Sequence, residues 1–554
     1  MLNYYLIVEQ SMYKIYHDEK FRLSYSNDFY SSTYDIILWF IYKIFKPLIM
    51  FRFLFFVTVT SICFLYGISI STNVVKSDNS TFRAAVYEYQ RYNNLSINGL
   101  DLLQVKRINL NSYSKAIQVA SQHGANIIVF PESGLFGVAN RLYALANYEY
   151  IPKANESITP CIDWPEESVE SRLSFSVYSL SCLAKNFNIY IAAILGEKID
   201  CSPIIDTNCP DDGHYLYNTQ ILFDSTGKLI AKYHKTHLFF EAANNIPREP
   251  EIVTVSTPFG KLGFLICFDI HFEQPALSLI YTESVDTILF GAHWIDESPF
   301  LNAHRVQSGF AIEHNVNLLA AGINDLINGA MGSGIYVAGE GPIIYTADIT
   351  KSGSKLLIAD IPKSKRLPIN EDNSYFIERE DKFVKLIENV GSLHEQSINT
   401  PYAQWTLELD LFDSTKLSQQ SGTITSCTEE LICCQVDYSL KNPTFISTYY
   451  LLVKRWIRPT TKICEQFCGL VAYNITDYSY TSTDIFSYLR LTGTFSGNLS
   501  IPSVITNNLQ LISKTDWIYA HKDNVAVITI NNSNQPIVAA TLYSRYEKDD
   551  QPIG

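Results

Sequence analysis

Residues 113–134, YSKAIQVASQHGANIIVFPESG, form the stretch of sequence that decides the fold class. Residues 113–123 have the apolar spacing of an amphipathic helix, and Gly124 follows at a position where helices commonly end. Residues 127–130 are a short β-branched and apolar run, which predicts a buried strand that Pro131 stops. The strand therefore delivers Glu132 at the point where the chain turns.

The same alternation of strands and helices continues from about residue 83 to residue 321. Predicted strands cover 84–89, 189–195, 221–223, 262–267, 287–290 and 317–321, and predicted helices cover 275–281 and 301–314. Alternating strands and helices are typical of a layered α/β domain. Residues 224–227 join two strand-like runs as a hairpin, so we expect a mixed sheet.

The composition changes after about residue 363. Residues 364–404 are polar and charged, and the runs beyond them are strand-like, with Gly, Asn and Ser between. These runs cover 405–411, 432–436, 448–453, 528–530 and 538–543. The sequence therefore predicts an α/β domain over 82–363 and a smaller, mostly β domain over 364–554.

An apolar run at residues 53–70 dominates the amino-terminal region, 1–72. With translation from Met50, this run has the basic, apolar and small-residue parts of a signal peptide, which is the interpretation we favour. The alternative is a type II membrane anchor with translation from Met1, because about 18 apolar residues just span a bilayer. Both interpretations place the rest of the chain outside the cytosol.

Other features fit export. Six positions match the N-x-[ST] glycosylation pattern: Asn79, Asn94, Asn155, Asn474, Asn498 and Asn531. The last residues, 548–554, lack the apolar tail of a GPI signal. We therefore expect a soluble, secreted protein without membrane contact after signal cleavage.

The composition excludes two classes of protein. Hydrophobic residues make up 47% and charged residues 18%, which excludes intrinsic disorder as the main state. Lys plus Arg number 42 against 56 Asp plus Glu, and the net charge of −14 argues against a nucleic-acid partner. The 11 cysteines are an odd number, so an oxidising compartment leaves at least one thiol unpaired.

Three strand-like stretches each lead to a residue with useful chemistry: residues 127–130 to Glu132, the stretch that begins at residue 231 to Lys235, and residues 263–266 to Cys267. The thiolate is the reactive form of cysteine, and a nearby ammonium lowers the pKa of a thiol. A carboxylate can take and return the proton. Together, a nucleophile, a base and a cation are what amide cleavage through a thioester requires.

These sites resemble those of the nitrilase (carbon–nitrogen hydrolase) superfamily, and most of all those of its vanin (pantetheinase) and biotinidase branch. The matching motifs are Phe130-Pro-Glu132, Tyr215-Leu-Tyr-Asn-Thr219, Lys232-Tyr-His-Lys235-Thr-His-Leu, Pro247-Arg-Glu-Pro-Glu-Ile-Val-Thr254, Cys267-Phe-Asp-Ile, Val285-Asp-Thr-Ile-Leu-Phe290 and Gly332-Ser-Gly-Ile-Tyr336. The likeness continues into the second domain and covers about residues 83–548. It implies an α-β-β-α sandwich followed by a vanin-type, β-rich domain.

Carried over by position, the resemblance implies that Glu132 is the proton acceptor, Lys235 stabilises the tetrahedral oxyanion and Cys267 is the nucleophile. Glu241 is either the second carboxylate that the superfamily places near the lysine or an exposed loop acid. We expect His271, His293 and Trp294 to line the substrate pocket.

No metal or other cofactor is expected. His234 and His237 have the spacing of metal ligands, but no third ligand is evident, and we interpret them as pocket walls or orienting groups. The partner is a small-molecule amide. We expect hydrolysis of pantetheine to pantothenate and cysteamine. The alternatives are hydrolysis of biocytin, a catalytically silent extracellular binding protein, and an acyltransferase that uses the same thioester.

The resemblance also bears on the cysteines. Cys161 with Cys182, and Cys201 with Cys209, are candidate disulfides. Setting aside Cys63 in the presumed signal peptide and the nucleophile Cys267, 11 − 2 leaves nine. We therefore expect one more unpaired cysteine, within the group from Cys427 to Cys468. In that group, disulfides are favoured over a zinc site at Cys464-x-x-x-Cys468.

Overall fold

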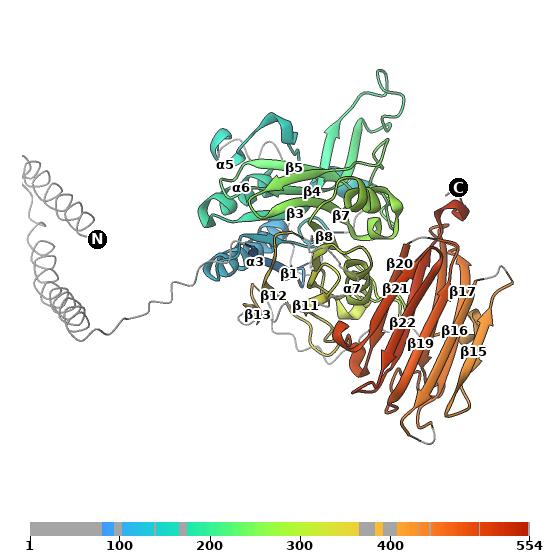
Figure 1. Ribbon diagram of the computed structural model, residues 1–554. Coiled ribbons are helices and arrows are strands. Elements are labelled where there is room, and N and C mark those ends of the chain that lie inside the picture. Colours follow the sequence, from blue (N-terminus) through green and yellow to red (C-terminus); the bar gives the residue numbers. More distant parts are fainter. Residues whose placement is uncertain are drawn as a thin grey trace, which may run out of the picture. The chain divides into compact units, whose positions relative to one another are not determined.

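The computed structural model describes residues 80–92, 102–137, 140–165, 174–364, 383–391, 407–429, 432–442, 445–497 and 499–551 (Figure 1). The expected signal peptide or anchor at residues 53–70 lies outside these ranges. Within them, no helix has both the length and the apolar character needed to cross a bilayer.

The first sheet has seven strands in the order β13-β12-β1-β2-β3-β4-β5. Their bounds are β1 Thr81–Glu88, β2 Ile127–Val129, β3 Tyr190–Asp200, β4 His214–Phe223, β5 Leu229–His234, β12 Lys355–Pro362 and β13 Val384–Glu388. Strands β1, β2 and β3 pair in parallel, and the other neighbours pair antiparallel. The mixed sheet expected from the hairpin at 224–227 is confirmed, since β4 and β5 are antiparallel.

Alternating side chains of this sheet enter two different cores. On β2, Ile127 and Val129 belong to the core shared with the second sheet, whereas Ile128 packs in the core under the helices. Those helices are α3 Leu102–Gln122 and α6 Phe175–Phe187. Both faces of the strand are therefore covered, which explains why residues 127–130 are apolar without alternation.

The second sheet has the order β11-β10-β9-β8-β7-β6. Its strands are β6 Thr254–Thr257, β7 Gly260–Ile266, β8 Thr287–Ala292, β9 Asn317–Gly322, β10 Gly334–Val337 and β11 Gly341–Tyr345. Helix α7, Ala303–Glu313, packs against it, and η4 Cys267–His271 and η5 Glu273–Thr282 follow β7. Helices, two sheets and a helix thus form the expected α-β-β-α sandwich.

The C-terminal region is a second sandwich of two antiparallel, five-stranded sheets, in the orders β14-β17-β18-β23-β20 and β15-β16-β19-β22-β21 (Figure 1). The strands are β14 Asp413–Lys416, β15 Ser421–Cys427, β16 Cys433–Leu440, β17 Tyr449–Ile457, β18 Cys464–Ala472, β19 Phe486–Thr494, β20 Leu499–Ile505, β21 Ile518–Lys522, β22 Val525–Asn531 and β23 Ala539–Arg545. The expected mostly β domain is confirmed.

The two sandwiches meet along α7. A Cβ atom on Gly309 would lie 2.4 Å from a side-chain carbon of Ile501 and 2.5 Å from the carbonyl oxygen of Pro502, so only glycine allows this approach. The buried Arg305 donates to Ser503 Oγ (3.0 Å) and Thr541 Oγ1 (2.7 Å). The C-terminal sandwich therefore closes the outer face of the helix.

Two details differ from the expectations. In the described part of the run at 405–411, residues 409–411 form a 3-10 turn, and the predicted strand is wrong. Leu407 is buried but Leu411 is 51% exposed, so the apolar side chains share no common face. Strand β13 lies beyond residue 363, yet it pairs with the free edge of β12, and the first sheet thus extends past the expected boundary.

Four disulfides occur in the described residues: Cys161–Cys182, Cys201–Cys209, Cys427–Cys433 and Cys434–Cys468. The two candidate pairs are confirmed. Cys267 and Cys464 are free and buried, so Cys464 is the further unpaired cysteine. Because Cys468 pairs with Cys434, it is not a zinc ligand.

The glycosylation positions divide into two groups. The side chains of Asn155, Asn474 and Asn531 are exposed. Asn79, Asn94 and Asn498 lie outside the described residues.

Candidate active site

Cys267 occupies a sharp turn at the end of β7. Its φ of 47° lies in the left-handed region, which costs a non-glycine residue free energy. The buried carboxylate of Asp269 holds this turn by accepting hydrogen bonds from Tyr233 OH (2.7 Å) and the backbone N–H of His237 (2.8 Å). Burial raises the pKa of Asp269 to about 7. Since residues 233 and 237 flank Lys235, Asp269 ties the cysteine turn to the lysine.

Glu132 follows β2 and is buried. Its Oε1 accepts hydrogen bonds from Lys235 Nζ (2.7 Å) and Asn218 Nδ2 (2.7 Å). Its Oε2 accepts a hydrogen bond from the backbone N–H of His293 (2.9 Å). Donors from three separate segments therefore fix the position of this carboxylate.

Lys235 follows β5, and its side chain is only 1% exposed. Its ammonium forms ion pairs with Glu132 and Glu241. Burial on its own lowers the pKa of Lys235, but the charges of the two carboxylates outweigh this effect and hold the pKa well above its usual value. Lys235 therefore remains charged. Glu241 is the carboxylate beside the lysine and not an exposed loop acid.

Two asparagines complete the polar cluster. Asn218 Nδ2 donates to Glu132 and also to Glu241 Oε2 (2.8 Å). Asn244 Nδ2 donates to the same Oε2 (2.8 Å), and its own Oδ1 accepts from Tyr148 OH (2.8 Å). The two carboxylates are thus held apart by amide donors and one ammonium, which offsets the repulsion between them.

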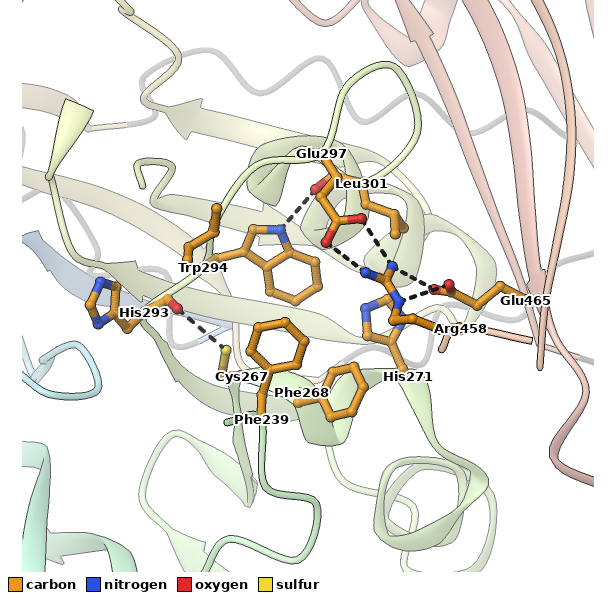
Figure 2. A pocket seen from close by; sticks show the side chains of 11 residues that line it. Phe239, Cys267, Phe268, His271, His293, Trp294, Glu297, Leu301, Arg458 and Glu465 are labelled. Carbon is orange, nitrogen blue, oxygen red and sulfur yellow. Dashed lines mark hydrogen bonds and ion pairs between the residues drawn. The ribbon is translucent and has the colours of Figure 1, made fainter. Parts of the chain in front are cut away.

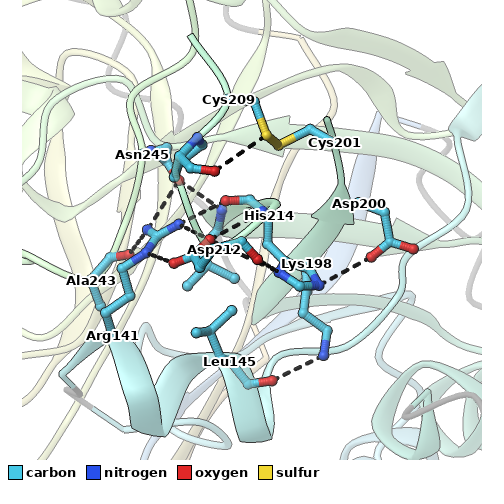
Figure 3. Close-up of polar contacts among 12 residues, drawn as sticks. Arg141, Leu145, Lys198, Asp200, Cys201, Cys209, Asp212, His214, Ala243 and Asn245 are labelled. Atoms are coloured by element: carbon cyan, nitrogen blue, oxygen red, sulfur yellow. Dashed lines mark hydrogen bonds and ion pairs between the residues drawn. A yellow bond between two sulfur atoms is a disulfide. The ribbon is translucent and has the colours of Figure 1, made fainter. Parts of the chain in front are cut away.

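A polar network outside the site braces the segment that follows Glu241 (Figure 3). Arg141 begins α4, Arg141–Asn147, and donates to Asp212 Oδ2 (2.5 Å) and to the carbonyl oxygen of Ala243 (2.9 Å). The disulfide Cys201–Cys209 closes the neighbouring loop. The arginine therefore connects this loop to the backbone two residues after Glu241.

The thiol of Cys267 lies in an environment that keeps it protonated at rest. Burial raises its pKa well above the usual value, the charge of Glu132 adds to this effect, and Lys235 opposes it. The thiol also approaches the carbonyl oxygen of His293, at 3.9 Å from Sγ. A thiol, a carboxylate that can accept its proton and a fixed ammonium are therefore brought together.

Cys267 opens onto a pocket with about 380 Å³ of empty space, part of it open to solvent (Figure 2). The aromatic rings of Phe239, Phe268 and Trp294 and the side chain of Leu301 form the apolar part of the lining. Further along, Glu297, Arg458 and Glu465 form a charged end wall. The last two residues belong to the C-terminal region, so both sandwiches line the pocket.

His271, His293 and Trp294, for which a place in the substrate pocket is predicted, line this pocket. They contribute in different ways. His293 holds Glu132 through its backbone, and Trp294 Nε1 donates to the carbonyl oxygen of Leu301 (2.8 Å). Burial, with nearby Arg545 and Arg458, lowers the pKa of His271 well below its usual value, so this ring is neutral.

His234 and His237 point to separate partners. Both ring nitrogens of His234 lie 2.8 Å from carboxylates, Nδ1 from Glu251 and Nε2 from Glu197. His237 Nε2 lies 2.7 Å from the carbonyl oxygen of Gln274, and its ring stacks on Phe272. Each ring is therefore engaged elsewhere, and among the described residues no group of three or more His, Cys, Asp or Glu is placed to hold a metal.

Sequence reasoning missed several polar residues of the site, namely Asn218, Asn244, Glu297, Arg458 and Glu465. Asn218 lies within the motif at 215–219, which contributed to the family resemblance but did not indicate a function for this residue. Glu297, Arg458 and Glu465 follow no local pattern and are brought to the pocket only by tertiary structure.

Comparisons with known proteins agree with this arrangement. Residues 105–363 match the carbon-nitrogen hydrolase family, and residues 402–550 match the vanin C-terminal domain. The chain is 31% identical to the pantetheinase of Bos taurus over 86% of this chain and 92% of that protein. It is 32% identical to the pantetheinase of Mus musculus, over 85% and 90%, and 29% identical to the biotinidase of Takifugu rubripes, over 84% and 94%.

Proposed function

Since the chain belongs to the carbon–nitrogen hydrolase family and carries the vanin C-terminal domain, we propose that it is a secreted pantetheinase that works through a thioester on Cys267. The family membership makes it a hydrolase of carbon–nitrogen bonds other than peptide bonds. The observation that carries the proposal is the direct contact of Lys235 with Glu132, beside the buried thiol of Cys267, at the pocket.

In the first half of the proposed reaction, the Cys267 thiol passes its proton to Glu132, and sulfur attacks the amide carbonyl carbon. The carbonyl oxygen gains negative charge, which Lys235 and the backbone N–H of Phe268 stabilise. Glu132 then protonates the amine nitrogen, and the carbon–nitrogen bond breaks. The amine leaves and the acyl group remains on sulfur as a thioester.

In the second half, Glu132 takes a proton from water, and the hydroxide oxygen attacks the thioester carbon. The tetrahedral oxyanion again faces Lys235. Its collapse releases the carboxylic acid, and the sulfur recovers a proton. Because Lys235 holds its charge in both halves, its raised pKa is consistent with an electrostatic role and not with proton transfer.

Pantetheine is proposed as the substrate because the pantetheinase relatives in Bos taurus and Mus musculus reach 31–32% identity. The biotinidase relative, at 29%, makes biocytin the second candidate. Four disulfides in the described residues support the proposed secretion, since disulfides persist in oxidising compartments.

The experiment compares the purified wild-type protein with Cys267→Ala on both substrates. We expect cysteamine release from pantetheine by the wild type and a loss of at least about 10³-fold in kcat/KM in the variant. Faster lysine release from biocytin would transfer the assignment to the second candidate. Full activity of a folded Cys267→Ala variant would overturn the thioester mechanism.

A further inference from the structure

The charged end wall of the pocket consists of one arginine between two carboxylates. Arg458 Nη1 and Nη2 donate to the two oxygens of Glu297, at 2.8 and 3.0 Å. Arg458 Nε and Nη2 donate to the two oxygens of Glu465, at 3.0 and 3.2 Å. Figure 2 shows this cluster facing the same space as Cys267. The wall therefore combines a residue of the catalytic sandwich, Glu297, with two residues of the C-terminal sandwich.

In this cluster, the arginine has fewer hydrogen-bonding groups left for a ligand than the two carboxylates have. These four bonds use Arg458 Nε and both terminal nitrogens, so little donor capacity is left on a guanidinium with five N–H groups. Each carboxylate oxygen still has acceptor capacity. Glu465 is further satisfied by Tyr543 OH at 3.1 Å, and its side chain is only 1% exposed. The side chain of Glu297 is 24% exposed and lines the pocket. Glu297 is therefore the accessible acceptor.

The charges of the cluster leave Glu297 as the carboxylate at the pocket, because Arg458 is shared by the two carboxyl groups and the further guanidinium of Arg545 acts on the more buried Glu465. A donor such as a hydroxyl or an amide N–H gains a charge-assisted hydrogen bond at such a wall. A carboxylate or phosphate would meet Glu297 at close range in a partly desolvated pocket, where like charges repel strongly. Between this wall and the thiol, the aromatic and apolar residues Phe239, Phe268 and Trp294 favour an aliphatic segment.

We propose that Glu297, held in place by Arg458 and Glu465, binds a hydroxyl donor at the end of the acyl group that is remote from the scissile amide. This proposal rests on the proposed function and deepens it by naming the substrate class: amides with an uncharged, hydroxyl-bearing acyl end and aliphatic carbons next to the scissile carbonyl. Pantetheine carries a terminal hydroxyl on its acyl part. The C-terminal sandwich then takes part in selecting the substrate.

The test combines one substrate change with one protein change. The substrates are pantetheine and its analogue in which the terminal hydroxyl of the acyl part is replaced by hydrogen. The proteins are the wild type, Glu297→Gln and the control Glu283→Gln. Glu283 also pairs with a lysine, at 2.7 Å from Lys261 Nζ, but it lies outside the pocket. The readout is kcat and KM for each combination.

The wild type should prefer pantetheine over the deoxy analogue by about 10- to 100-fold in kcat/KM, since a hydrogen bond to a charged group is lost. Glu297→Gln should raise KM for pantetheine and shrink this preference to a few-fold, whereas Glu283→Gln should keep it. A preference that is unchanged in Glu297→Gln overturns the proposal. Equal cleavage of the two substrates by the wild type also overturns it, whether or not the variant folds.

Failure of the proposed function looks different. In that case, the wild type cleaves neither pantetheine nor its analogue, and the preference is not defined. Cleavage of pantetheine that depends on Cys267 but is indifferent to the terminal hydroxyl supports the function and rejects the role of Glu297. Thermal melting of each variant shows that the comparison is made on folded protein.

Discussion

The two sandwiches differ in what they bury. The catalytic sandwich places Glu132, Lys235 and Asp269 inside, each no more than 3% exposed. Glu132 pairs with Lys235, and Asp269 accepts hydrogen bonds from Tyr233 and His237. The C-terminal sandwich packs an apolar core between its sheets and joins β16 to β18 with the disulfide Cys434–Cys468. Buried charge costs free energy unless it is paired, so the pairing of Glu132 with Lys235 at the pocket, beside the buried thiol of Cys267, indicates function and not stability.

The C-terminal sandwich also buries charge where it borders the pocket. Arg458 and Glu465 are 8% and 1% exposed, and both line the pocket beside Cys267. The buried charge of the C-terminal sandwich at this border therefore also belongs to the pocket. A region with a structural core can therefore still contribute to the active site through a few residues at its edge.

Removing Lys235 should have the largest effect, because it changes both catalysis and stability in the catalytic sandwich. In Lys235→Met, Glu132 and Glu241 lose their shared counter-charge, and the oxyanion loses its cation. We expect kcat/KM for pantetheine to fall by about 10³-fold or more and the free energy of unfolding to fall by about 3–5 kcal/mol. Steady-state kinetics and denaturant unfolding measure the two effects. Lys185→Met, an exposed lysine on α6, is the control and should change neither quantity.

Removing a disulfide from the C-terminal sandwich should lower stability without changing catalysis. The double variant Cys434→Ala/Cys468→Ala opens a link between residues 34 apart in sequence. Chain entropy then lowers the free energy of unfolding by about 3–4 kcal/mol, while kcat and KM stay unchanged. Removing Cys427–Cys433, with a separation of 6, should cost less, about 2 kcal/mol. Loss of catalysis in the folded Cys434→Ala/Cys468→Ala variant would contradict the division of roles.

The ion pairs of His234 in the catalytic sandwich can be tested through the pH dependence of stability. Burial lowers its pKa, but hydrogen bonds and charges from Glu197 and Glu251 outweigh burial and raise the pKa to about 9. A raised folded-state pKa stabilises the protein fully below the unfolded value of about 6.5, and this contribution disappears as pH rises through 9. Compared with His234→Gln, the wild type should therefore lose roughly 3 kcal/mol of unfolding free energy across this range. Parallel curves for the two proteins against pH would contradict the ion pairs.

Most strands of the catalytic sandwich could be predicted from the sequence, because both faces of its central strands are buried and the apolar runs are continuous. Residues 127–130 and 287–290 are examples, realised as β2 and β8. The run at 405–411 failed because its apolar residues do not face one core. Strand β13 was missed because it is an exposed edge strand without apolar alternation.

The site residues also divide into those that the sequence predicts and those that only the tertiary structure reveals. Glu132, Lys235 and Cys267 follow predicted strands, so local pattern and chemistry were enough to find them. Arg458 and Glu297 are 161 positions apart and meet only because the two sandwiches pack together, which no local pattern reports. The cysteine count predicted one further unpaired cysteine but could not identify it as Cys464, because pairing depends on distances between strands.

In the proposed reaction, Cys267 carries the acyl group of the substrate. Wild-type enzyme is mixed with excess pantetheine, quenched in acid within milliseconds and digested, and the peptides are analysed by mass spectrometry. We expect a pantothenoyl adduct on the peptide that contains Cys267, removable by hydroxylamine and absent from Cys267→Ala. An adduct on a different residue, with Cys267 unmodified during turnover, would contradict the proposed reaction.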